Sequence, residues 1–219
     1  MSTSLPRPYY DHGGITIYHG DCREILPHLG KFDLLLTDPP YGIGEAAGRN
    51  KSRSRIAVSA DYGDEDWDDA PPTPETIAAC RAVCTHQIIF GGNYFELPAN
   101  SCWLVWDKDN GENDFADCEL AWTNLTKAVR RKRYRWQGML KEPGRRKEQR
   151  VHPTQNPLEV ISWALGHAPA SVATVLDPFM GSGTTLRAAK NRGLRAVGIE
   201  RVERFCEAAA NRLRQEVLF

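Results

Sequence analysis

The sequence lacks any apolar run long enough to cross a bilayer, and no such run follows a charged start near Met1. We therefore expect neither membrane insertion nor secretion, but a protein in the cytoplasm. Its 219 residues, of which 41% are hydrophobic, are enough for one sizeable core. Because no linker or internal repeat divides the chain, we expect a single domain over residues 1–219.

Paired cysteines are also missing from the chain. Its six cysteines show no paired metal-ligand spacing, and Cys80 and Cys84 are simply one helical turn apart. We expect buried free thiols and no bound metal.

The chain has no net charge, because 28 basic residues balance 28 acidic ones, but the charges are segregated. Residues 127–150 hold eleven Lys or Arg against two Glu, with Tyr134 and Trp136 among them. Cations mixed with aromatic rings suit a phosphate backbone and exposed bases, although a solvated surface is the simpler alternative. We expect a short basic insert over residues 127–151 to contact nucleic acid. The candidate contacts are Arg130, Arg131, Arg133, Arg135 and Trp136.

A second basic group lies in a stretch rich in Gly, Ser and Asn, a composition that predicts a mobile loop over residues 42–73. Its candidate nucleic-acid contacts are Arg49, Lys51 and Arg53. Residues 61–69 follow with six acidic residues and no basic one, so this part cannot contact phosphate.

Short apolar runs alternate with helical patterns along the chain, which predicts a doubly wound α/β fold with a mostly parallel sheet. We expect seven strands, at 15–19, 33–37, 87–91, 102–106, 119–122 with 125–129, 174–177 and 195–200. We expect helices at 22–29, 74–84, 157–167, 183–192 and 202–217. Ligands of such sheets bind at the carboxyl ends of the strands.

A glycine-rich turn follows the predicted strand that ends at Asp177. Gly181 and Gly183 have no side chains, so the backbone can approach a ligand closely, and Thr184 begins a helix. The turn lacks the lysine of a phosphate-binding loop, which argues against ATP or GTP hydrolysis. One strand later Glu200 is placed to accept the two hydroxyls of a ribose. These features predict a site for a nucleoside cofactor.

The other diagnostic segment, Asp38-Pro39-Pro40-Tyr41, follows the predicted strand that ends at Thr37. The two prolines fix the backbone and remove amide donors, so carbonyl oxygens stay free to accept hydrogen bonds. An exocyclic amine is a poor nucleophile because its lone pair is delocalised into the ring. Asp38 and the Pro39 carbonyl could accept hydrogen bonds from such an amine. Tyr41 could stack on a base that has left a nucleic-acid helix.

Together the two segments resemble the amino-group DNA methyltransferases, which methylate N6 of adenine or N4 of cytosine with S-adenosylmethionine. The order, catalytic segment before cofactor segment, resembles the circularly permuted members of this family. Further segments match in order: Tyr18-His19-Gly20-Asp21, residues 90–95, Trp106-Asp107-Lys108, Glu119 with Trp122, and residues 152–157. The resemblance implies a Rossmann-like class I methyltransferase fold.

The resemblance also implies further cofactor contacts. Asp21 would lie near the adenine of the cofactor, Asp177 near its methionine amine and Phe179 beside the pocket, and Thr154 and Gln155 would complete the site. The family commonly has lysine where Asn156 stands, so no role is carried over to Asn156. Plain structural roles, a helix cap for a strand-end Asp and core packing for Phe179, are the alternatives.

The aspartate form of the catalytic tetrapeptide is usual in the adenine enzymes of this family, so we expect adenine, with N4 of cytosine as the alternative. A methyltransferase of RNA or of a protein glutamine is a further alternative. The glutamine enzymes usually have asparagine before the two prolines, which speaks against them. A non-enzymatic nucleic-acid-binding module is a third, disfavoured by the intact pocket residues.

The resemblance further suggests a solitary methylase of phage, prophage or bacterial origin and not a complete restriction-modification system. DNA is the expected partner, and no contact with a membrane is expected. A homodimer is compatible with the resemblance, because dimers are frequent in the family. The sequence identifies no interface patch.

Overall fold

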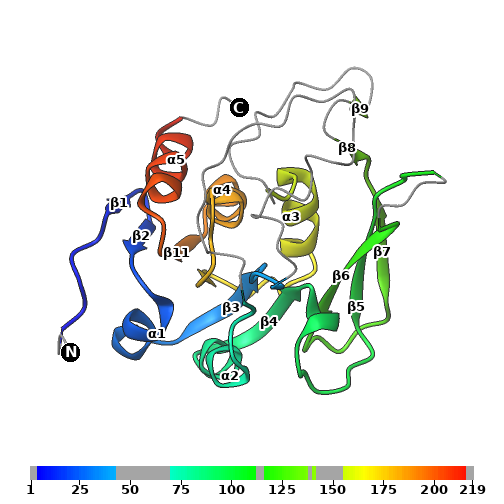
Figure 1. Ribbon diagram of the computed structural model, residues 1–219, viewed down its shortest axis with the longest axis horizontal. Coiled ribbons are helices and arrows are strands. Elements are labelled where there is room, and N and C mark those ends of the chain that lie inside the picture. Colours follow the sequence, from blue (N-terminus) through cyan, green and yellow to red (C-terminus); the bar gives the residue numbers. More distant parts are fainter. Residues whose placement is uncertain (1–3, 43–69, 112–115, 138–139, 142–154, 216–219) are drawn as a thin grey trace.

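A single large sheet organises the protein (Figure 1). The computed structural model describes residues 4–42, 70–111, 116–137, 140–141 and 155–215. In these residues the sheet has nine strands, in the order β1-β2-β11-β10-β3-β4-β6-β5-β7, so the predicted number of seven is wrong. A separate two-stranded hairpin is formed by β8 and β9.

The strands of the large sheet are β1 (Tyr10–His12), β2 (Ile15–His19), β3 (Phe32–Thr37), β4 (Cys84–Phe90), β5 (Trp103–Asp107), β6 (Cys118–Thr123), β7 (Arg130–Arg133), β10 (Thr174–Asp177) and β11 (Arg195–Glu200). The hairpin strands are β8 (Trp136–Gln137) and β9 (Leu140–Lys141). The helices are α1 (Cys22–Ile25), α2 (Pro74–Ala82), α3 (Leu158–Leu165), α4 (Thr184–Asn191) and α5 (Glu203–Arg214), and short 3-10 turns are η1 (Leu26–His28) and η4 (Gly92–Tyr94).

Helices cover both faces of the sheet, as a doubly wound fold requires. Figure 1 shows α1 and α2 on one side and α3, α4 and α5 on the other. The alternation of strand side chains explains this: Leu34 and Leu36 pack with residues of α3, α4 and α5, whereas Leu35 packs with residues of α1 and α2. A central strand buried on both faces must be apolar throughout, which is why β3 contains the run Leu34-Leu35-Leu36.

Two strands that the hydrophobic pattern did not reveal lie at the edges of the sheet. β1 is three residues long and pairs antiparallel with β2, and β7 pairs parallel with β5. β7 reads Arg-Arg-Lys-Arg, because charged side chains are tolerated where one side of the strand meets solvent. The predicted strand at 125–129 is wrong. The carbonyl of Leu125 accepts a hydrogen bond from the side chain of Asn100 (3.4 Å), and its amide donates to the hydroxyl of Thr123 (3.2 Å).

The predicted helices are present but shorter. The helix expected at 22–29 ends as α1 at Ile25 and continues as η1, because Pro27 has no N–H for the α-helical ladder. The five cysteines at 22, 80, 84, 102 and 206 are buried, whereas Cys118 is exposed, contrary to expectation. No helix in the described part of the chain is long and apolar enough to span a membrane.

The order in which successive strands are added to the sheet reverses between β3 and β10, which are neighbouring parallel strands. From β3 the chain proceeds to β4 on one side, and from β10 it proceeds to β11 on the other. Such a reversal opens a crevice outside the carboxyl ends of the two strands, where ligands of α/β sheets bind. Both diagnostic segments of the sequence begin at the carboxyl ends of these two strands.

Candidate active site

A buried hydrogen bond joins the two diagnostic segments. The hydroxyl of Thr37, at the end of β3, donates to Asp177 Oδ1, at the end of β10, over 2.7 Å. The backbone amide of Phe179 donates to the same oxygen (3.2 Å). Asp177 is only 3% exposed, and burial raises the pKa of its carboxyl to about 6. The bond therefore aligns the ends of the two strands and brings the predicted catalytic and cofactor segments together.

Asp38 follows directly and is held by two donors. The amide nitrogen of Asn156 donates to Oδ2 (2.7 Å), and the hydroxyl of Tyr41 donates to Oδ1. Burial raises the pKa of Asp38 to about 7, and the nearby carboxylate of Glu119 adds to the rise, while the two hydrogen bonds oppose it. Glu119 itself pairs with Lys108 (2.5 Å). Asp38 is thus a carboxyl group with a raised pKa directly after the carboxyl end of β3.

The ring of Tyr41 is fixed by aromatic neighbours. It stacks on Tyr94, with ring centroids 4.7 Å apart and planes inclined by 16°, and meets Phe95 edge-on. Gly91 lies beneath it at φ +64°, where a Cβ atom would overlap the tyrosine ring. Only glycine fits there, for both reasons. Burial and the Asp38 carboxylate raise the pKa of the Tyr41 hydroxyl, so it remains a donor.

Pro39 and Pro40 lie between these two groups. Pro39 is buried and Pro40 is half-buried. All four residues of the predicted catalytic tetrapeptide are therefore grouped at the carboxyl end of β3. Which atoms they present to a substrate stays a prediction.

Glu200 ends β11 and reaches back to the glycine-rich turn. Its Oε2 accepts from the amide of Gly181 (3.0 Å) and its Oε1 from the amide of Val202 (2.8 Å). Burial raises the pKa of this carboxyl to about 7, against the lowering effect of the two amides. Phe179, in the same turn, is half-buried and packs toward α1 and α2.

Gly183 and Thr184 have structural partners in the turn. Gly183 is in the left-handed region at φ +76°, and a Cβ atom there would lie 2.8 Å from that of Ala209 on α5. The glycine therefore lets α4 and α5 approach, a reason that the sequence did not indicate. The hydroxyl of Thr184 accepts from Arg212 of α5 (2.9 Å). Cofactor contacts by these two residues stay predictions.

Asp21 lies at the same edge of the sheet, because β2 and β11 are parallel and pair His19 with Glu200. It caps α1: its Oδ1 accepts from the amide of Arg23 (2.8 Å), and its Oδ2 pairs with the Arg23 guanidinium (2.5 Å). This guanidinium lowers the pKa of Asp21. The helix-cap alternative is thus present, and the contact with a cofactor adenine stays a prediction.

Gln155 and Asn156 connect the two halves of the site. The Oε1 atom of Gln155 accepts from Ser182 in the glycine-rich turn (3.4 Å), while Asn156 donates to Asp38. Both side chains are buried. Sequence reasoning assigned no role to Asn156, and only its position beside a segment with predicted contacts pointed to it. Thr154, the remaining predicted contact of this segment, lies outside the described residues.

The predicted basic residues of β7 lie at one edge of the sheet. Arg131 and Arg133 are about two-thirds exposed and pair with Asp107 of β5 (3.7 and 3.4 Å), and Arg135 pairs with Asp109 (2.8 Å). Arg130 is exposed. Trp136 is half-buried and packs against the core, so only part of its ring is accessible.

The direction of β7 places these residues relative to Asp38. β6 is antiparallel to both β4 and β5, and β7 is parallel to β5, so β7 runs in the direction of β3 and β4. Its carboxyl end therefore lies at the edge of the sheet that carries Asp38. Four strand spacings separate β3 from β7, which is about 19 Å. Arg49, Lys51 and Arg53 lie outside the described residues.

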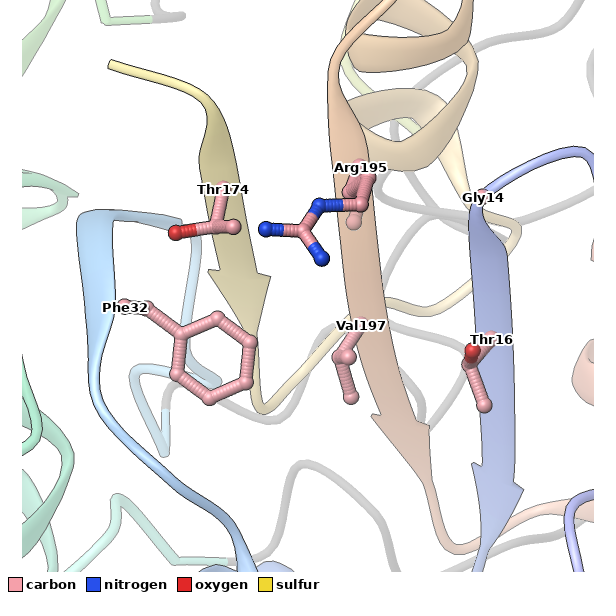
Figure 2. Close-up of a pocket in the computed structure, with 7 residues that line it drawn as sticks. Gly14, Thr16, Phe32, Thr174, Arg195 and Val197 are labelled. Carbon is pink, nitrogen blue, oxygen red and sulfur yellow. The ribbon is translucent and has the colours of Figure 1, made fainter. Parts of the chain in front are cut away.

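A shallow pocket exists at the opposite edge of the sheet, among the amino ends of β2, β11, β10 and β3. Figure 2 shows Phe32, Thr174 and Arg195 around it. It is remote from the carboxyl ends and cannot include Asp38 or Glu200. The described residues contain no cluster of three or more His, Cys, Asp or Glu that could hold a metal ion.

Comparison with known proteins identifies the family. The profile of the N6/N4 methyltransferases, described as DNA methylase, matches residues 98–211, more than half of the chain. Type II methyltransferase M.ScaI of Streptomyces caespitosus is 25% identical over 99% of this chain and 86% of its own. M2.DpnII of Streptococcus pneumoniae is 24% identical over 97% and 94%.

Solved structures show the same fold. The complex of M1.HpyAVI with SAM has a TM-score of 0.57 at 24% identity, over 90% of this chain and 99% of its own. The cytosine-N4-specific PvuII DNA methyltransferase has a TM-score of 0.61 at 13% identity, over 97% and 91%. The chain therefore belongs to the N6/N4 DNA methylase family.

Proposed function

We propose that this protein transfers a methyl group from S-adenosylmethionine to the exocyclic N6 amine of adenine in DNA, after the base has left the helix. The observation that carries the proposal is the Thr37–Asp177 hydrogen bond. It joins the acceptor-rich Asp38 segment to the glycine-rich turn at the point where the strand order of the sheet reverses. Methyl transfer to an amine requires hydrogen-bond acceptors for that amine next to a site for the nucleoside cofactor.

The residues present fit this cofactor. Asp177 and Glu200 put two carboxyl groups beside the glycine-rich turn, and burial raises the pKa of each. Carboxylates at this position would repel a pyrophosphate but suit a ligand that carries a sulfonium and an ammonium group. Glu200 ends the strand after the glycine-rich turn, where an acidic side chain can accept from ribose hydroxyls. S-adenosylmethionine is thus the methyl donor.

Bound S-adenosylmethionine would supply an electrophilic methyl group, and the neutral thioether would be the leaving group that keeps the electron pair of the carbon–sulfur bond. Asp38 and the Pro39 carbonyl would accept hydrogen bonds from the two amine hydrogens. These bonds would localise the lone pair on the nitrogen. Asp38, with its pKa near 7, is suited to take the proton that the methylated amine loses. Tyr41 would stack on the base, which recovers about 1–3 kcal/mol.

Adenine is favoured over cytosine by Asp38 itself, since in this family the aspartate form of the tetrapeptide is usual for adenine. N4 of cytosine remains the second candidate, because the same acceptors would serve it. We also infer the permuted arrangement, since residues 37–41 precede the turn at 177–185.

The test of base identity is direct. Unmethylated plasmid DNA is incubated with protein and isotopically labelled S-adenosylmethionine, digested to nucleosides and analysed by mass spectrometry. We expect the label in N6-methyladenine. Label in N4-methylcytosine would overturn the choice of base, and label in RNA or protein but not in DNA would overturn the substrate class.

A further inference from the structure

Asn156 contacts the group on which the proposed reaction depends. Its Nδ2 lies 2.7 Å from Asp38 Oδ2, and its side chain is 9% exposed. A bond between a neutral donor and a carboxylate is stronger than one between neutral groups, and its removal leaves a buried acceptor without that partner. The contact is long-range, because 118 residues separate the two side chains in the sequence.

The backbone around Asn156 is fixed on both sides. Gln155 precedes it and is held by Ser182 of the glycine-rich turn (3.4 Å), and Pro157 follows it as the N-cap residue of α3. The proline restricts the backbone of Asn156 to extended conformations. The amide therefore reaches Asp38 from a rigid support that also touches the cofactor turn.

We propose that Asn156 is a positioning residue that holds Oδ2 of Asp38, so that the carboxylate meets the target amine in one orientation. This inference rests on the proposed function, in which Asp38 accepts from the amine. Oδ1 accepts from the hydroxyl of Tyr41, whose ring stacks on Tyr94. Asn156 constrains the rotation of the carboxylate from the other side.

The Asn156 amide donates to the carboxylate, so it favours the ionised form of Asp38, although it carries no charge of its own. The charged and titratable groups that face Asp38 are Tyr41 in its own segment, Glu119 of β6, whose partner is Lys108, and Asp177 of β10. Both carboxylates raise the pKa of Asp38, and the Asn156 bond lowers it. Loss of the Asn156 donor should therefore move the ionisation of Asp38 to higher pH, and a carboxylate at position 156 should move it further.

The experiment measures cofactor affinity, turnover and the pH profile of kcat/KM for Asn156→Leu and Asn156→Asp. The first keeps the branched shape without the donor, and the second replaces the donor by a charge. We expect turnover about 10- to 100-fold lower in Asn156→Leu, the size of one hydrogen bond to a charged group. Affinity for S-adenosylmethionine should stay near that of the unaltered protein. The acidic limb of the pH profile of kcat/KM should shift to higher pH in Asn156→Leu and further in Asn156→Asp.

Asn211→Leu and Asn211→Asp, on the exposed side of α5, are matched controls with no expected effect. Asp38→Ala is measured in parallel. An inactive Asp38→Ala with normal turnover in Asn156→Leu would overturn the role of Asn156 alone, as would a loss of turnover without any shift of the pH profile. Full activity of Asp38→Ala would overturn the proposed function and this inference together.

Discussion

Glu200 is held by two backbone amides, so its carboxylate is pre-oriented at the end of β11. Replacing it with alanine should weaken S-adenosylmethionine binding about 10- to 100-fold, because hydrogen bonds to a charged group contribute about 1.5–3 kcal/mol. Titration calorimetry measures this change. Glu203→Ala, in the exposed first turn of α5, is the control and should bind normally. Equal affinity of Glu200→Ala and the control would contradict the ribose assignment.

The carboxyl groups of the crevice also predict a pH dependence of cofactor binding. Burial raises the pKa of Asp177 to about 6 and that of Glu200 to about 7, above their ordinary range, so both are partly protonated at pH 6 in the free protein. A cationic ligand favours the ionised forms, and binding at pH 6 should therefore release protons. Affinity should rise as pH increases from about 5.5 to 7.5 and then level off.

Calorimetry in two buffers of different ionisation enthalpy measures the released protons. The observed heat at about pH 6 should differ between the buffers, and the difference should vanish near pH 8.5, where both groups are already ionised. Proton uptake on binding in the acidic range, or an affinity that falls as the pH rises towards neutrality, would contradict the placement of the cofactor among these groups.

At the scale of elements, the contact between α4 and α5 depends on Gly183. Gly183→Ala would place a Cβ atom 2.8 Å from that of Ala209, at φ +76°. Gly193 is the matched control, because it has a similar φ of +69° but no atom within 4 Å of the Cβ that alanine would add. The left-handed conformation alone costs about 1–2 kcal/mol, and overpacking adds about 1–3 kcal/mol in Gly183→Ala only.

Denaturant unfolding of the two variants separates these effects. The free energy of unfolding should fall more in Gly183→Ala than in Gly193→Ala. Equal losses would mean that α5 moves away at no cost, and that the glycine does not serve the packing of the two helices.

The basic edge strand β7 offers a second test at this scale. Arg131 and Arg133 of this strand pair with Asp107, and the nearby Arg135 pairs with Asp109, so DNA phosphates would have to compete with these carboxylates. Reversing the charge of Arg131, Arg133 and Arg135 should weaken DNA binding. The slope of log affinity against log salt should flatten by about 0.9 for each phosphate that the variant no longer neutralises.

Arg195→Glu is the control for this experiment, because Arg195 begins β11 at the amino ends of the parallel strands (Figure 2), away from the carboxyl ends where Asp38 lies. It should leave the salt slope unchanged. An unchanged slope in the β7 variant as well would return this strand to the alternative of a solvated surface.

How far the sequence predicted the elements depended on burial. β3, β10 and β11 are central and apolar, and their predicted positions agree with the structure to within one residue. β7 was missed because an exposed edge strand needs no hydrophobic alternation, and its existence depends on pairing with β5. β1 is too short to show a period.

At the scale of the whole molecule, the sequence indicated that two segments 139 residues apart form one site, because both follow strands whose carboxyl ends meet at one edge. It did not indicate the contacts between side chains that complete the site. The Asn156–Asp38 bond and the Tyr41–Tyr94 stack join residues from separate elements. Such contacts depend on tertiary packing, which a local pattern does not contain.

In the proposed reaction, Asp38 is the group that only the transfer step requires. The most direct measurement compares Asp38→Ala with the unaltered protein at saturating S-adenosylmethionine, following labelled methyl groups into DNA and cofactor affinity in parallel. We expect methyl transfer to be abolished while cofactor affinity changes little. Unchanged turnover at saturation, with only cofactor affinity reduced, would contradict the role assigned to Asp38.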